Sequence, residues 1–221
     1  MSRPPASHRP PPPAAADVGR GTDGGDAAGT PLPPRRNPFR SARIDALRFR
    51  LDEGWEALWA RFEALGRRAS LVGPEGSGKT ALLLEIEARL ARQGFRVRRL
   101  QLKREQRRPD ARAWRAALRA RGPRTVVSVD GAEQLSRWRW HRLARATRRA
   151  GGLIVTSHHP GLLPTLHHHH TSPALLADLV AELAGQDTAT ALRAELERLF
   201  AEHHGNLRDC LRALYDRAAR G

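Results

Sequence analysis

A glycine-rich segment that ends in lysine and threonine could bind phosphate groups. Residues 73–80 read GPEGSGKT, which matches the spacing G-x-x-x-x-G-K-[ST] of a phosphate-binding loop. In such a loop, backbone N–H groups and the N-terminus of the next helix face the phosphates, and glycines let the chain bend around them. Lys79 would reach the β- and γ-phosphates, and the Thr80 hydroxyl would ligate Mg²⁺. The predicted nucleotide contacts are Gly73, Pro74, Glu75, Gly76, Ser77, Gly78, Lys79, Thr80 and Ala81.

Two carboxylates downstream could complete a site for metal-assisted phosphate chemistry. Asp130 ends the apolar run VVSVD, and a carboxylate at a strand end near the loop holds Mg²⁺, usually through water. Asp130 and Thr80 are therefore the predicted metal ligands. Glu133, three residues further on, is the predicted base that orients the attacking water. The alternative interpretation of Glu133 is a glutamate stabilised by the N-terminus of the next helix.

Polar residues also end the run IVTSHH and begin the segment GNLRDCLRALYD. Ser157 and His158, with Thr156 behind them, are predicted to face the γ-phosphate at the carboxyl edge of a sheet. The alternative for His158 is a histidine that is simply hydrogen-bonded at a strand end. Arg208 falls in the first turn of the last predicted helix, three residues after Gly205.

The apolar pattern predicts the elements that position these side chains. Short apolar or alternating runs predict strands at 69–73, 95–102, 125–130 and 151–158, and a short fifth strand near 164–169. Helical patterns lie between the strands, including one from Lys79 to Arg92. The expected fold is α/β, with a parallel sheet of about five strands and helices on both faces. Three helices, at about 172–184, 188–204 and 206–219, predict a C-terminal helical lid.

Four of these motifs, in this order along the chain, resemble those of a known family. GPEGSGKT, VVSVD, IVTSH and GNLR resemble the Walker A, Walker B, sensor 1 and sensor 2 elements of the AAA+ ATPases and their STAND-like relatives. The resemblance covers roughly residues 50–220 and implies a P-loop NTPase core with a lid. It also implies that Arg208 reaches the γ-phosphate from the lid, so that nucleotide state moves the lid. The alternative for Arg208 is a solvated helix face.

The chain departs from the family pattern at two places. Gly131 follows Asp130, where many relatives have glutamate, which is why Glu133 is the candidate base. Between Ser157 and the fifth strand lies only HHPGLLP, with no helix to carry the family's arginine finger. Such fingers contribute about 10³–10⁵ in rate, so slow intrinsic turnover or a finger from another protein is expected. No NKxD motif occurs, which favours ATP over GTP.

Composition sets the remaining expectations. The 221 residues carry a formal net charge of +16, and Lys79 and Lys103 are the only lysines among 39 basic residues. This charge fits a nucleic-acid partner or, alternatively, the arginine-rich surface that a GC-rich genome encodes. One cysteine and the lack of a long apolar run predict a cytoplasmic protein without membrane contact. The predicted domains are a disordered Pro/Gly-rich tail at 1–37, an α/β domain at 38–171 and the lid at 172–221.

Two further segments allow alternative interpretations. LHHHHT could bind a transition metal or form a polar strand end, and the second interpretation is preferred because neighbouring residues of a strand point to opposite faces. RWRWHRLARATRR could bind nucleic acid by stacking and charge, or Trp138 could pack on the sheet with the arginines in water, and the second interpretation is preferred.

The motifs together favour an ATP-binding and ATP-hydrolysing switch, with Lys79, Asp130, Glu133 and Arg208 as catalytic residues. ATP and Mg²⁺ are the expected cofactors, and a protein partner or self-association is compatible with a switch. The alternative is a nucleic-acid-binding protein that uses ATP as a structural or gating ligand with little turnover.

Overall fold

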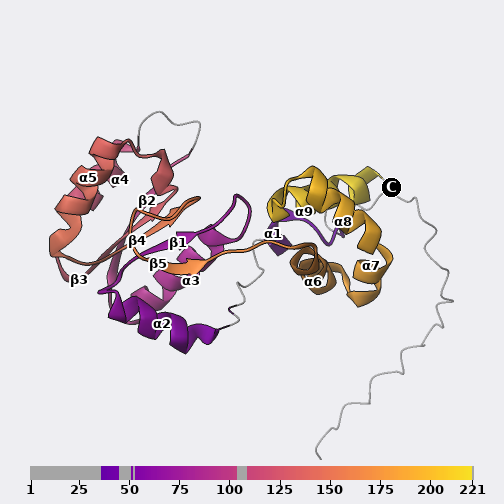
Figure 1. The fold of residues 1–221 in the computed structure, drawn as a ribbon, viewed down its shortest axis with the longest axis horizontal. Helices are drawn as coiled ribbons and strands as arrows, with labels where there is room; N and C mark the ends of the chain where they lie inside the picture. Colours follow the sequence, from indigo (N-terminus) through magenta and orange to yellow (C-terminus); the bar gives the residue numbers. More distant parts are fainter. Residues whose placement is uncertain (1–35, 45–50, 52, 104–108, 221) are drawn as a thin grey trace, which may run out of the picture.

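The computed structural model describes residues 36–44, 51, 53–103 and 109–220, which form a parallel sheet layer and a separate group of C-terminal helices (Figure 1). The sheet has five strands in the order β2-β3-β4-β1-β5, and every neighbouring pair is parallel. The strands are β1 (Arg68–Val72), β2 (Arg96–Gln101), β3 (Gly122–Asp130), β4 (Ala150–Ser157) and β5 (Thr165–His168). The predicted α/β fold with a five-stranded parallel sheet is confirmed.

Helices cover both faces of the sheet because residues of the central strands alternate between two apolar clusters. On one face, α2 (Gly54–Ala64) and α3 (Lys79–Arg92) contribute Leu58, Phe62 and Leu83 to a cluster that also holds Ile154 of β4. On the other face, α4 (Ala111–Leu118) and α5 (Arg137–Ala146) cover Leu153 and the other inward residues of a second cluster. Two short 3₁₀ helices, η1 (Ala132–Gln134) and η2 (Thr147–Arg149), flank α5.

The C-terminal helices have an apolar core of their own. They are α6 (Pro173–Ala184), α7 (Gln186–Ala191), α8 (Arg193–Glu202) and α9 (Leu207–Arg220). Their buried residues include Leu176, Val180, Leu199 and Leu211, which pack together in one cluster. Ser172 begins α6 by accepting a hydrogen bond from the backbone N–H of Leu175.

The structure corrects the predicted helix at 188–204, which is two helices that meet at Leu192. The Thr188 and Thr190 hydroxyls each donate to a carbonyl four residues earlier, Ala184 and Gln186 respectively. Such hydroxyl bonds to the preceding turn bend helices, which accounts for the break.

The structure also divides the chain differently near its first described residues. Phe39 and Ile44, with α1 (Ser41–Ile44), pack in the cluster of the C-terminal helices, although residues from 38 were expected in the α/β domain. Asn37 holds this segment there by donating from Nδ2 to the Tyr215 carbonyl at 2.9 Å. The predicted disordered tail at 1–37 lies outside the described residues except for its last two.

Parallel pairing brings the strand ends that carry the predicted site to one edge of the sheet. The loop 73–78 follows β1, Asp130 ends β3 and Ser157 ends β4. Since β4 lies between β1 and β3, the polar residues at its end stand between the loop and Asp130.

Candidate functional site

The loop 73–78 is a tight turn that depends on glycine. Gly76 and Gly78 have φ of 71° and 88°, in the left-handed region, and Gly78 is the residue before the first turn of α3. Ser77 is buried, and its hydroxyl donates to the Pro74 carbonyl at 2.8 Å. The loop therefore leads directly into a fourteen-residue helix whose N-terminal N–H groups lie next to it.

Lys79 is a buried cation held inside this turn. Its side-chain Nζ donates to the carbonyl oxygens of Gly73 at 2.8 Å and Pro74 at 2.6 Å, and 8% of the residue is exposed. Desolvation lowers the pKa of Lys79, while the nearby carboxylates of Glu133 and Asp130 act to raise it. The ammonium group thus lies within the field of both predicted carboxylates.

Asp130 is the acceptor at the centre of a polar network. Its Oδ1 accepts from the hydroxyls of Thr80 at 3.0 Å and Thr156 at 2.9 Å, and it is 7% exposed. Thr156 in turn accepts from the Gly131 N–H at 2.8 Å. The network connects Thr80, at the start of α3, with Asp130 of β3 and Thr156 of β4. The Thr80 hydroxyl and the Asp130 carboxylate, which contact each other directly, are oxygen ligands of the kind that Mg²⁺ prefers.

A basic residue missed by sequence reasoning completes this network. Arg99 of β2 donates to Oδ2 of Asp130 at 3.1 Å, and its other terminal nitrogen lies 3.5 Å from Glu87 of α3. β2 pairs with β3 so that Arg99 stands opposite Ser128. Arg99 and Asp130 are 31 positions apart in the sequence and meet because β2 pairs with β3. The alternating pattern of FRVRRLQL predicts the strand but does not show which of its arginines contacts Asp130.

Glu133 is brought back toward Lys79 by a turn at Gly131. Gly131 has φ of 83°, and a Cβ there would lie 2.8 Å from the Leu102 carbonyl oxygen, so a larger residue does not fit. In η1, one carboxylate oxygen of Glu133 is buried without a hydrogen bond to any described residue. The other lies 3.7 Å from Nε2 of His158. The structure thus brings Glu133 and His158 together beside Lys79.

Ser157 is engaged with its own chain. Its hydroxyl donates to the His159 carbonyl at 2.7 Å and accepts from the His159 N–H at 3.3 Å. Thr156, which was expected behind the site, makes the contact to Asp130 instead. The predicted contacts of Ser157 and His158 with a γ-phosphate stay predictions.

His169 contacts the loop 73–78 and was not among the predicted site residues. It follows β5, its backbone N–H donates to the Val72 carbonyl at 2.6 Å, and its Nδ1 lies 3.0 Å from the Ser77 carbonyl oxygen. A Cβ on Gly73 would lie 2.6 Å from the Cβ of His169. Burial lowers the pKa of His169 to about 3, so the ring is neutral.

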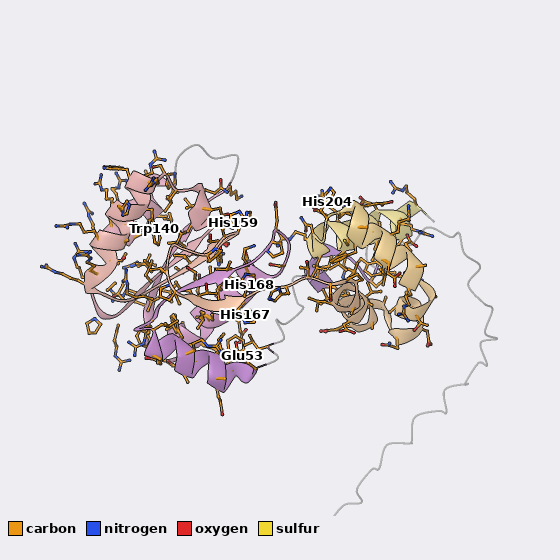
Figure 2. All side chains as sticks on the ribbon, viewed as in Figure 1. Glu53, Trp140, His159, His167, His168 and His204 are labelled. Carbon is orange, nitrogen blue, oxygen red and sulfur yellow. The ribbon has the colours of Figure 1, made fainter. Side chains whose placement is uncertain are left out.

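The other histidines of this segment form a polar strand end. His167 lies 3.4 Å from Glu53, the residue before α2 (Figure 2). The rings of His168 and His170 are stacked, with their centres 4.7 Å apart. Among the described residues, no three His, Cys, Asp or Glu side chains are arranged to hold a metal ion.

The C-terminal helices reach the loop at the start of α9. A Cβ on Gly76 would overlap the side-chain oxygen of Asn206, which also accepts from the Asp209 N–H at 3.2 Å. Arg208, two residues later, is exposed in the first turn of α9. Its predicted contact with a γ-phosphate stays a prediction. Asn206, two residues before Arg208 in GNLR, is the residue that meets the loop.

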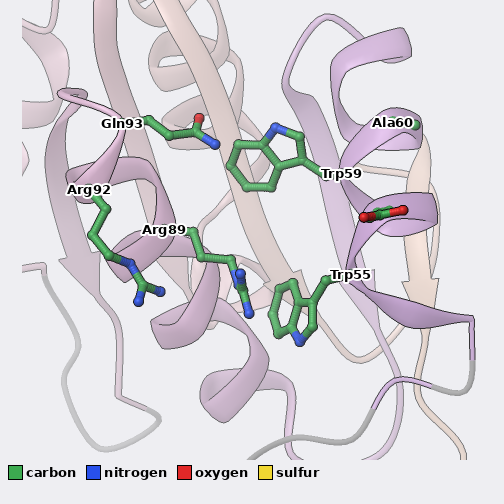
Figure 3. A pocket seen from close by; sticks show the side chains of 7 residues that line it. Trp55, Trp59, Ala60, Arg89, Arg92 and Gln93 are labelled. Atoms are coloured by element: carbon green, nitrogen blue, oxygen red, sulfur yellow. The ribbon is translucent and has the colours of Figure 1, made fainter.

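A hollow with a volume of about 470 Å³ lies away from these residues, between α2 and α3 (Figure 3). Trp55 and Trp59 line one side and Arg89 and Arg92 the other, with the Arg89 guanidinium 3.9 Å from the centre of a Trp55 ring. None of the predicted site residues lines it.

None of the described helices combines the length and apolar character needed to cross a bilayer.

Comparison with known proteins finds similarity to solved structures but not to a sequence family. No protein-family model matches the chain, and no curated protein matches it significantly. The chain is similar to NtrX from Brucella abortus, whose crystal structure was determined in complex with ATP, with 14% sequence identity and a TM-score of 0.41. The match covers 80% of this chain and 51% of NtrX, so the chain spans about half the length of that protein.

Proposed function

We propose that the chain is an ATP-binding and ATP-hydrolysing P-loop NTPase of AAA+-like type that acts as a nucleotide-dependent switch. The observation that carries this proposal is the meeting of Lys79, Thr80 and Asp130 at the carboxyl edge of the sheet. A lysine, a hydroxyl and a carboxylate around a glycine-rich turn at a helix N-terminus are the groups that bind a triphosphate with Mg²⁺.

Each group has a separate task in this proposal. The backbone N–H groups of residues 76–80 bind the phosphates, and Lys79 exchanges its two carbonyl partners for phosphate oxygens, which are stronger acceptors. Thr80 and Asp130 provide the oxygen atoms for Mg²⁺, which neutralises phosphate charge when bound. The hard oxygen donors fit that ion, and ATP is preferred because the chain has no NKxD motif.

Glu133 is the proposed base. Its buried carboxylate oxygen, which no described residue satisfies, can accept a hydrogen bond from a water molecule and orient that water for attack. His158 lies near the other oxygen and limits the directions in which the carboxylate can turn. The turn at Gly131 would allow Glu133, three positions after Asp130, to take the role that many AAA+ ATPases give to the residue directly after the Walker B aspartate.

The lid is proposed to report the state of the loop through α9. Asn206 packs against Gly76, so a change in the loop's path on phosphate binding displaces the start of α9. We expect Arg208, in the same turn, to follow that displacement toward the phosphates.

Lys79→Ala tests nucleotide binding. The variant should weaken the binding of a fluorescent ATP analogue with Mg²⁺ by about tenfold or more, because a charged hydrogen-bond donor to phosphate is lost. Lys103→Ala removes the chain's other lysine, which is exposed, and should leave the affinity within about twofold of wild type. Equal affinity of wild type and Lys79→Ala would contradict the proposal.

Glu133→Gln tests the assignment of the base. The variant should still bind ATP, but phosphate release should fall by about 10²–10⁴, the usual contribution of a general base. Glu56→Gln removes an exposed carboxylate on α2 and should hydrolyse ATP like the wild type. Unchanged turnover in Glu133→Gln would show that another group orients the water.

A further inference from the structure

A tryptophan on α5 is largely exposed to solvent. Trp138 is 65% exposed, whereas Trp140, on the other side of the same helix, packs against the cluster beneath α5 (Figure 2). The interpretation that Trp138 packs on the sheet is therefore wrong. Leaving a large aromatic side chain in water forgoes the burial that usually stabilises it, which makes the position a candidate contact for a partner.

The surface around Trp138 is strongly basic. Residues 136–149 contain six arginines and no aspartate or glutamate. Some exposed arginines elsewhere in the described chain form ion pairs, as Arg193 does with Glu197 and Arg198 does with Glu202. For Arg142 and Arg145, in contrast, the described residues provide no ion pair. The positive charge of this face is thus available to an external anion.

Helical spacing places the aromatic ring and the charges on one face. Trp138, Arg142 and Arg145 follow each other at intervals of four and three residues, and with His141 they are all exposed. The Arg142 guanidinium lies 5.3 Å from the centre of the Trp138 ring. We call these four residues the α5 outer face. α4 packs beside α5 (Figure 1). It adds exposed arginines at positions 112 and 115, and Arg119, directly after α4, is also exposed.

We propose that the α5 outer face binds single-stranded nucleic acid. A base stacks on the exposed ring of Trp138, and Arg142 and Arg145 bind the phosphates on either side of it. A single strand fits better than a duplex, because bases in a duplex are stacked on each other and cannot reach a ring that lies on a convex helix. Charge complementarity and an available stacking surface are the two features that define this ligand class.

The α5 outer face also follows Glu133 closely in the sequence. Ser136, which begins α5 by accepting from the Arg139 N–H, comes three residues after Glu133. Binding on the first turn of α5 would therefore act on the segment that positions Glu133. The binding itself does not depend on the proposed ATPase function.

Two double variants with the same change in charge separate a site from a general charge effect. Binding of the full chain to a fluorescein-labelled oligo(dT) of about 20 nucleotides is followed by anisotropy at several salt concentrations. Arg142→Gln/Arg145→Gln should weaken binding about tenfold at low salt and reduce the log–log salt slope by about 1.4, since each single-strand phosphate contact contributes about 0.7. Arg193→Gln/Arg198→Gln on α8 should change the affinity less than twofold.

Trp138→Leu tests stacking, because leucine keeps an apolar side chain without a ring. It should weaken oligo(dT) binding by about fivefold to a hundredfold and leave the salt slope unchanged. Four results would overturn the proposal: no binding at low salt, equal losses in the two double variants, wild-type affinity in Trp138→Leu, or binding to anionic vesicles but not to the oligonucleotide. Circular dichroism of each variant confirms that the fold is kept, as expected for exposed residues.

Discussion

Acid should destabilise the fold through His169, the neutral histidine that contacts the loop 73–78. Burial lowers its pKa from 6.5 to about 3, so between these values the unfolded chain binds a proton that the folded chain does not. The resulting stability is fully present above pH 6.5 and is lost as the pH falls from 6.5 toward 3. His169 is 2% exposed, so solvent screening does little to reduce the effect.

The size of the effect follows from linkage. Each pH unit between the unfolded and folded pKa values costs about 1.4 kcal/mol, so a drop from pH 7 to pH 5 removes about 2 kcal/mol. This is a large share of the 5–15 kcal/mol that is typical of a folded domain. The loss should be felt first at the loop, because His169 contacts Ser77 and Gly73.

Urea unfolding of wild type and His169→Gln at pH 7 and pH 5 measures this contribution. Glutamine does not titrate and can still donate to the Ser77 carbonyl, so the variant should lose about 2 kcal/mol less than wild type between the two pH values. His141→Gln, at an exposed position, should keep the full wild-type loss. An equal acid-dependent loss in wild type and His169→Gln would refute the reasoning.

Two further predictions concern the scaffold, both measured by urea or thermal unfolding. Gly131→Ala should lower the free energy of unfolding by about 1–3 kcal/mol, and by more than Gly122→Ala does. Both glycines have positive φ, but only a Cβ at position 131 would press against the Leu102 carbonyl oxygen. Equal losses in the two variants would contradict this steric explanation. Phe62 is fully buried in the cluster between α2 and the sheet, so Phe62→Ala should lower the free energy of unfolding by about 3–5 kcal/mol. Leu84 is 46% exposed, and Leu84→Ala should lower it by well under 1 kcal/mol. Similar losses in the two variants would contradict the assigned core.

Local signals account for the parts of the fold that the sequence predicted well. The helix expected from Lys79 to Arg92 has these bounds in the structure, because its apolar spacing and the glycines on both sides are all within one segment. The strands were predictable for the same reason, as continuous or alternating apolar runs. The break at Leu192 was not, since two threonine hydroxyl bonds decide it and both residues also occur inside straight helices.

Contacts across the sheet account for the parts of the candidate site that sequence reasoning missed. Arg99, His169 and Asn206 each come from a segment far from the loop, and each meets the site because of strand order or lid placement. A single sequence contains no information on which of its arginines stands beside Asp130. The pattern did indicate where Thr80 and Asp130 would meet, since Asp130 ends β3 and Thr80 follows β1 through the loop, and both strands end at the same edge of the sheet.

Two sets of contacts connect the loop 73–78 and its surroundings to distant surfaces, one through Asn206 to α9 and one through Glu133 to α5. They differ in how rigidly they would transmit a displacement. Asn206 joins Gly76 to α9, and its side chain also bonds Asp209, so a displacement of the loop would be passed to a fourteen-residue helix as a unit. The route through Glu133 is shorter, but it crosses a three-residue 3₁₀ helix before α5 begins at Ser136. The first route suits the movement of the C-terminal helices that we propose. The second suits a small change in the orientation of Glu133, which, for the base proposed above, would alter the hydrolysis rate without altering affinity.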